Sequence, residues 1–240
     1  MALAFSLLGG LAVLLGAGLI VWRYEWCNRR RDVLIAFAAG SLISLALLEL
    51  LPEALMQDRH AAYHTLGGFV LLFLFDQFLH PHHYAGEPAL DRPVSLAAWF
   101  GILLHSLIDG FVIGAGFQAS ASIGALITFG IALHKFVDGF ASSSILLGLQ
   151  FNRARLLAYS SVMALATPVG TVLSGLVFTG RMEADAWLPA VLGLTAGMFI
   201  YIAAGDFLPH LHGVRSRGPM VSFLLGCLSF AALKMMFPGG

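Results

Sequence analysis

Charged side chains are scarce in this chain, and their scarcity excludes an ordinary water-soluble domain. Only 11% of the 240 residues are Asp, Glu, Lys or Arg, against roughly 25% in soluble proteins. Thirteen basic and 13 acidic residues give a net charge of zero, so we expect no nucleic-acid partner. Since 59% of the residues are hydrophobic, lipid is the expected solvent for most of the surface.

Cysteine is also scarce, and regular apolar alternation is missing. Cys27 and Cys227 form neither a Cys-x-x-Cys motif nor a disulfide framework. The apolar segments do not alternate with period two, which excludes an outer-membrane β-barrel. Only helices and closed barrels satisfy every backbone polar group in lipid. The chain is therefore predicted to be an all-α membrane protein.

Apolar runs separated by short polar breaks fill the chain. A membrane span takes about 20 apolar residues, so this length has room for about eight transmembrane helices. The expected spans are 2–22, 33–56, 62–80, 95–117, 122–149, 155–179, 187–209 and 219–237. No break is long enough to separate two domains, so residues 1–240 are expected to form a single integral membrane transport domain.

The basic residues are distributed unequally between the two sides of the expected bundle. The breaks after the odd-numbered runs contain Arg23, Arg29, Arg30, Arg31, Arg92, Arg153, Arg155, Arg215 and Arg217. The opposite side contains Arg59, Arg181 and Lys234. Because cytosolic loops are rich in Lys and Arg, both termini are expected outside the cytosol. Short loops and the lack of a targeting sequence suggest a bacterial inner membrane.

Two pairs of segments within the chain resemble each other. HSLIDGF at 105–111 matches HKFVDGF at 134–140, and ELLPE at 49–53 matches DFLPH at 206–210. The last two segments lie on runs that cross the membrane in opposite directions, as in an inverted repeat. We therefore expect a 3+2+3 arrangement, with the first three and last three helices as the repeats.

The 105–111 and 134–140 segments carry the chemistry. His105 and Asp109 share one helix face because they are four residues apart, and His134 and Asp138 repeat this spacing. Each pair lies near mid-membrane depth, where an ionisable group costs on the order of 3 kcal/mol. A short connection makes the two helices antiparallel neighbours. Two imidazoles and two carboxylates can then converge on one zinc-class ion.

A lone intramembrane His or Asp is often only a hydrogen bond between helices. Four such residues at duplicated spacing favour a metal site instead. Lys135, which follows His134, can hydrogen-bond Asp109 or Asp138, and its charge repels a second cation. Ser106 at the matching place is a poor ligand, so a single metal is expected.

Further polar residues lie nearer the ends of the expected helices. A transport pathway is predicted from Glu49, Glu53, Asp76, His80, Asp206 and His210. The alternative for each is helix capping or solvation at the membrane surface. The cluster of His80, His82 and His83 either binds metal weakly or is an ordinary exposed loop.

These residues resemble the ZIP (ZRT/IRT-like) family of divalent-metal transporters. The resemblance is carried by HSLIDG, HKFVDG, LLELLPEAL, LATPVG at 165–170 and YIAAGDFLPHL at 201–211, and it covers essentially the whole chain. It implies a divalent cation, zinc first and iron, manganese or cadmium as alternatives, moved towards the cytosol. It also implies alternating access by an elevator-type movement, with His105, Asp109, His134 and Asp138 as the metal ligands.

The chain departs from the family pattern in informative ways. Many relatives have Glu at the places of Asp109 and Asp138. The positions that hold a second metal in some relatives look like Ser106, Lys135 and Thr167 here, which agrees with a single site. We expect no permanent cofactor and no enzymatic activity; the expected partners are the transported ion and the lipid bilayer. Monomer and homodimer both stay open. The alternative function is a membrane-embedded zinc-dependent hydrolase.

Overall fold

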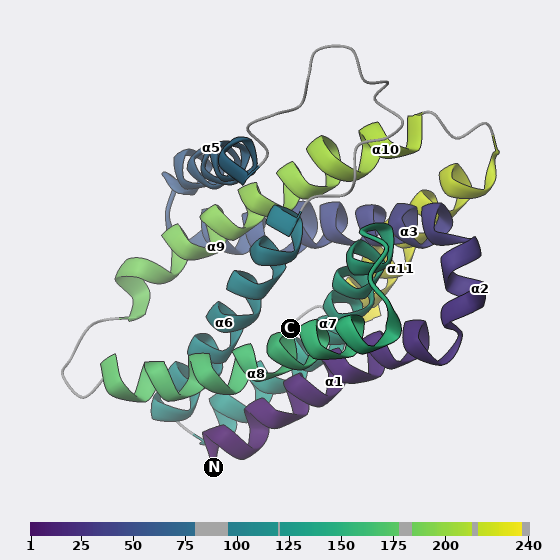
Figure 1. The fold of residues 1–240 in the computed structure, drawn as a ribbon. Helices are drawn as coiled ribbons and strands as arrows, with labels where there is room; N and C mark the ends of the chain where they lie inside the picture. Colours follow the sequence, from purple (N-terminus) through teal and green to yellow (C-terminus); the bar gives the residue numbers. More distant parts are fainter. Residues whose placement is uncertain (80–95, 120, 178–183, 213–215, 237–240) are drawn as a thin grey trace.

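The computed structural model describes residues 1–79, 96–119, 121–177, 184–212 and 216–236, and these residues form helices and short connections without strands (Figure 1). The helices are α1 (Ala2–Trp22), α2 (Tyr24–Arg29), α3 (Arg31–Leu45), η1 (Ala46–Leu50), α4 (Leu51–Gln57), α5 (Ala61–Leu79), α6 (Leu96–Ala119), α7 (Ala121–Gly148), α8 (Arg153–Val177), α9 (Ala184–Tyr201), η3 (Ile202–Phe207), α10 (Leu208–His212) and α11 (Gly218–Met236). The all-helical prediction is confirmed for this part of the chain. The break expected between the first two runs contains a short helix, α2.

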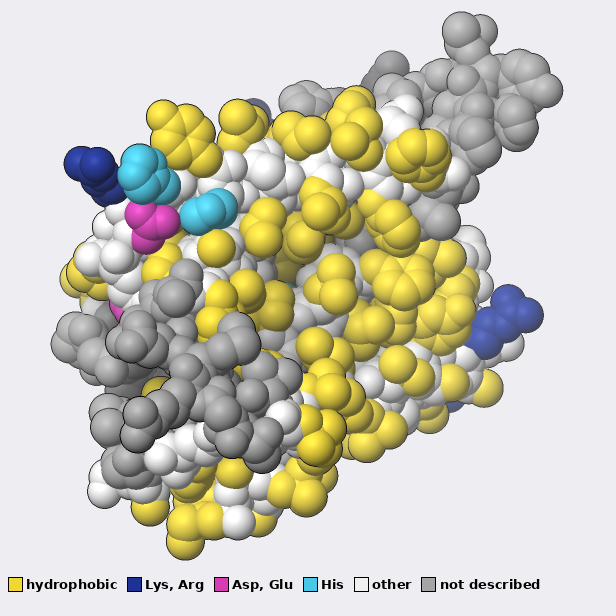
Figure 2. Space-filling model, turned by 90° about the vertical axis from the view of Figure 1, so that its left-hand side faces the viewer, with side chains coloured by type: hydrophobic (Ala, Val, Ile, Leu, Met, Phe, Trp, Pro, Cys, Tyr) yellow, Lys and Arg dark blue, Asp and Glu magenta, His cyan; other side chains and the backbone are white. Residues whose placement is uncertain are grey.

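The protein is an integral membrane protein. Five helical segments within the described residues are long and apolar enough to cross a membrane, namely Ala2–Trp22, Arg31–Gln57, Ala98–Gln118, Arg153–Leu176 and Trp187–Gly205. On the face shown in Figure 2, hydrophobic side chains gather over much of the described surface, and the charged side chains that are visible lie near its margins. The full set of eight spans and the 3+2+3 arrangement stay predictions.

Two long helical segments contain a widened, π-helical turn. The turn η1 lies between α3 and α4, and η3 lies between α9 and α10. Each ends one residue before a Leu-Pro pair, which contains Pro52 in the first case and Pro209 in the second. Proline lacks the N–H that would continue an α-helical ladder, so a local change of helix type relieves the mismatch. The matching sequence segments therefore have matching backbones.

The helices separate into two groups, which we call the first and second bundles. In the first bundle α1 packs on α7 and α8, and α6 packs on the same two helices. In the second bundle α3 packs on α11, α5 packs on α9, and η1, α4 and η3 connect these pairs. In Figure 1 α1 and α8 lie below, while α5, α9 and α3 lie above. The bundles meet chiefly where α3 contacts α7 and where α9 contacts α6.

Glycine pairs hold the closest helices together. A Cβ atom on Gly16 of α1 would overlap the carbonyl oxygen of Phe136 in α7, and one on Gly139 of α7 would overlap that of Val13 in α1. The same reciprocal contact joins Gly110 to Gly170 between α6 and α8, Gly40 to Gly226 between α3 and α11, and Gly68 to Gly197 between α5 and α9. Close backbone packing matters here because lipid supplies no hydrophobic drive for helix association.

The Gly16→Ala variant is therefore expected to destabilise the protein by about 1–3 kcal/mol, the usual cost of overpacking. Gly18 on the same helix is a matched control, because nothing lies within 4 Å of a Cβ added there. Gly18→Ala should be neutral or stabilising by up to about 1 kcal/mol. Thermal unfolding of the detergent-purified variants would measure both. Equal stability of the two variants would contradict the close packing of α1 on α7.

Candidate metal centre

Two neighbouring helices of the first bundle each present one histidine and, a turn later, one aspartate. His105 and Asp109 lie on α6, and His134 and Asp138 lie on α7. Residues four apart share a helix face, so each pair points in one direction. All four side chains are buried, with residue exposures between 0% and 6%. The sequence pattern alone thus places both pairs correctly within their helices.

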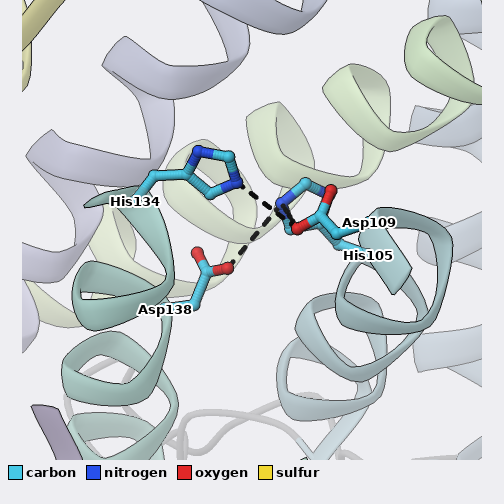
Figure 3. A group of neighbouring side chains, drawn as sticks. All are labelled: His105, Asp109, His134 and Asp138. Carbon is cyan, nitrogen blue, oxygen red and sulfur yellow. Dashed lines mark hydrogen bonds and ion pairs between the residues drawn. The ribbon is translucent and has the colours of Figure 1, made fainter. Parts of the chain in front are cut away.

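The four side chains converge between α6 and α7 (Figure 3). One ligand atom from each lies within 4.8 Å of the others. The Nε2 atom of His105 is 3.1 Å from Oδ2 of Asp109 and 3.7 Å from Oδ2 of Asp138. The Nε2 atom of His134 is 3.3 Å from the same Asp109 oxygen. Two imidazole nitrogens and two carboxylates suit zinc or another first-row divalent ion.

Lys135 is fully buried beside these carboxylates. Its ammonium nitrogen is 2.7 Å from Oδ2 of Asp109 and 3.2 Å from Oδ2 of Asp138, and it donates a 2.8 Å hydrogen bond to Ser106. A fixed positive charge therefore neutralises part of the two carboxylates. Thr167 of α8 is also buried, and its hydroxyl has no hydrogen-bond partner within the described residues.

Glu49 is the pathway residue that the structure brings next to the centre. Its Oε1 atom lies 3.8 Å from Nδ1 of His134, and its side chain is 20% exposed. Glu49 belongs to η1 in the second bundle, whereas His134 belongs to the first. The contact therefore crosses the boundary between the bundles.

The other predicted pathway residues are not brought to the centre by the contacts described. Glu53 is exposed and accepts a 2.6 Å hydrogen bond from Gln57. Asp76 of α5 accepts a 2.9 Å hydrogen bond from the hydroxyl of Tyr201 in α9. Asp206 lies on η3 and His210 on α10, with side chains outside the described part, and the cluster of His80, His82 and His83 lies outside the described residues altogether.

Two aromatic residues of α9 were missed from the sequence. The ring of Phe199 meets the ring of His105 edge-on, with centroids 4.7 Å apart. Tyr201 is buried and hydrogen-bonds Asp76. Neither position has a sequence signal, because aromatic residues in an apolar run are as readily assigned to lipid as to the interior.

A comparison with protein families decides the class of this protein. The family model described as ZIP zinc transporter matches residues 85–234, more than half of the chain. The chain belongs to the ZIP zinc transporter family. This ZIP protein is accordingly a membrane transporter of divalent metal ions, and the predicted resemblance and function class are confirmed.

Individual relatives agree with the family. Zinc transporter zipt-7.1 of Caenorhabditis briggsae is 22% identical over 75% of this ZIP protein, and the match spans 61% of the nematode protein's length. Zinc transporter ZupT of Escherichia fergusonii is 27% identical over 86% of this chain and 85% of its own length. Zinc transporter ZIP4 of Mus musculus is 32% identical over 52% of this chain and 18% of its own length. The assignment of individual ligands in this ZIP protein stays a prediction.

Proposed function

We propose that this ZIP protein carries zinc towards the cytosol through one metal centre made by His105, Asp109, His134 and Asp138. The observation that carries this proposal is the convergence of the four buried side chains, whose ligand atoms lie within 4.8 Å of one another. Zinc is the preferred ion because it accepts mixed imidazole and carboxylate ligands in a four-coordinate site. Iron, manganese and cadmium are alternative substrates.

A single ion fits the charges at the centre. Lys135 lies within 3.2 Å of both carboxylates and fills the space between them and Ser106. A second divalent cation beside this ammonium would be repelled at short range. The positions of Ser106, Lys135 and Thr167 therefore favour one metal over two.

Alternating access is supported by how the centre is enclosed. All four proposed ligands come from α6 and α7 in the first bundle, while Glu49 and Phe199, which contact the two histidines, come from the second. A movement of one bundle against the other would carry the four ligands together. It would change only which residues of the second bundle lie against the centre. An elevator-type movement is the simplest form of this change.

The direction of transport is proposed from the exposures of Glu49 and Phe199, the two residues of the second bundle that contact the histidines. Glu49, which contacts His134, has a side chain that is 20% exposed, whereas Phe199, which contacts His105, has an exposure of 0%. With both termini outside, η1 and the exposed Glu53 lie towards the outer surface, so the ion would enter past Glu49 and Glu53. It would leave past Asp206, Asp76 and the ends of α9 and α5.

We further propose that residues 1–240 form one transport domain with eight spans in a 3+2+3 arrangement. The repeated π-helical turns before Pro52 and Pro209 support this arrangement. The glycine contacts also support it, because α1 pairs with α7 in the same way as α8 pairs with α6. The proposed location is a bacterial inner membrane, with the arginine-rich connections in the cytosol. A homodimer is compatible with this layout.

A membrane-embedded zinc hydrolase is the alternative function. A catalytic zinc usually keeps three protein ligands and one open position for water. Here four side chains converge, with one ligand atom from each within 4.8 Å of the others, so a four-coordinate ion would have no open position for water. This number of ligands favours transport over hydrolysis. Lipid hydrolysis that a chelator abolishes would favour the enzyme instead.

Uptake by the pure protein tests the proposal. Proteoliposomes containing the wild-type chain are expected to accumulate radioactive zinc with saturable kinetics, whereas liposomes without protein should not. Iron, manganese and cadmium are measured in parallel to rank the substrates. If the protein transports none of the four ions, the proposed function is overturned.

A further inference from the structure

The two histidines of the centre are held in different ways. His134 has a carboxylate at each ring nitrogen: Nε2 hydrogen-bonds Asp109 at 3.3 Å, and Nδ1 lies 3.8 Å from Glu49. Polar contacts on both sides of the imidazole fix the direction of the ring. Metal-binding histidines normally have such a partner on the nitrogen that does not face the metal.

His105 lacks this support. Its exposure is 1%, yet neither ring nitrogen has a hydrogen-bond partner within the described residues. Nε2 lies 3.1 Å from Asp109 without the alignment of a hydrogen bond, and both carboxylates near the ring, those of Asp109 and Asp138, lie on the side of Nε2 and not of Nδ1. Because hydrogen bonds do not set the orientation of this imidazole, packing has to set it.

Phe199 supplies that packing. Its ring stands at 70° to the imidazole with a centroid separation of 4.7 Å, and its exposure is 0%. An edge-to-face aromatic pair prefers this geometry and resists rotation of either ring. The next aromatic neighbour, the imidazole of His134, is 5.7 Å away and tilted by only 33°, so it offers a weaker constraint.

We propose that Phe199 is a positioning residue that orients His105 for metal binding, and that it does so only while the two bundles are aligned as described. This inference rests on the proposed function, because it assumes that His105 binds the transported ion. Phe199 lies on α9 in the second bundle, whereas His105 lies on α6 in the first. A movement of the first bundle would remove the ring from the imidazole, weaken the hold of His105 on the ion and favour its release.

Binding of Co²⁺ alone to the purified full-length protein tests the inference, because its visible absorption spectrum reports the number and geometry of its ligands. Phe199→Ala is expected to weaken Co²⁺ binding about tenfold, the range seen when groups that orient a metal ligand are removed. The spectrum should change towards that of His105→Ala. Phe199→Tyr retains the ring and is expected to restore both affinity and spectrum.

Phe207→Ala is the matched control for loss of a buried ring. Phe207 lies in η3 on the same long segment and is equally buried, with an exposure of 0%. The Phe207→Ala substitution should lower the unfolding temperature without changing the Co²⁺ spectrum. A Phe207→Ala variant with the same altered spectrum as Phe199→Ala would overturn a specific role for Phe199.

The double variant separates this inference from the function on which it rests. If Phe199 acts through His105, the His105→Ala/Phe199→Ala protein should bind Co²⁺ no more weakly than His105→Ala alone. If His105→Ala leaves binding unchanged, the proposed metal centre is wrong. If His105→Ala weakens binding while Phe199→Ala leaves affinity and spectrum unchanged, only the positioning role is overturned.

Discussion

The Asp138→Ala and His134→Ala variants are each expected to lose roughly 100-fold or more of zinc uptake, since removing a direct ligand should cost at least as much as removing a group that orients one. Both side chains are buried, and each supplies one of the four converging ligand atoms. Truncating either residue leaves a three-ligand site beside the Lys135 ammonium. Initial rates of radioactive zinc uptake in proteoliposomes measure the effect.

Ser144→Ala is a suitable control for these variants. Ser144 lies on α7 and is fully buried, but its hydroxyl donates a 2.8 Å hydrogen bond to the carbonyl of Phe140 in its own helix. Its replacement should leave uptake close to the wild-type rate. Wild-type rates in both Asp138→Ala and His134→Ala would remove the assignment of the metal centre.

The Lys135→Met variant is expected to lose about 3–5 kcal/mol of stability in the absence of metal, the usual cost of breaking a buried charge pair. Lys135 is within 3.2 Å of an oxygen of both Asp109 and Asp138, and none of the three residues is more than 6% exposed. Without the ammonium, the two carboxylates would repel each other in a medium of low dielectric constant. Zinc supplies the missing positive charge, so zinc should stabilise the variant more than the wild type.

Thermal unfolding with chelator and with zinc measures this difference. Ser106→Ala is the matched control, because it removes the 2.8 Å hydrogen bond to Lys135 but leaves every charge in place. The control is expected to lose only about 1 kcal/mol, whether or not zinc is present. A Lys135→Met protein as stable as the wild type in chelator would show that Lys135 does not balance the two carboxylates.

Much of the candidate centre could be predicted because its spacing is local. His105 with Asp109, and His134 with Asp138, are pairs one helical turn apart, and the helix period fixes their common face whatever surrounds them. The contact of Lys135 with Ser106 follows from the same local register once α6 and α7 are neighbours. The all-helical class followed from the long apolar runs, because lipid leaves few other ways to satisfy the backbone.

Contacts between the bundles could not be predicted in the same way. A helix that is hydrophobic all round has no distinct apolar face, so its sequence does not tell which side meets lipid and which side meets protein. Phe199 therefore looked like any lipid-facing residue, and the helical nature of residues 24–29 was missed in a break rich in arginine. Glu49 was assigned to a pathway, but its place beside His134 was not foreseen.

The sequence by itself determined that this protein lies in a membrane, that it belongs with the ZIP transporters, and that two His-x-x-x-Asp-Gly segments lie within long apolar helices. These properties depend on composition and on spacing within single helices. The tertiary structure alone decided which residue of the second bundle contacts each histidine: Glu49 contacts His134, and the ring of Phe199 contacts His105. The reason is physical. Glu49 and Phe199 are each more than 50 residues away in the chain from the histidine that they contact, so packing between the bundles, and not local periodicity, brings them to the centre.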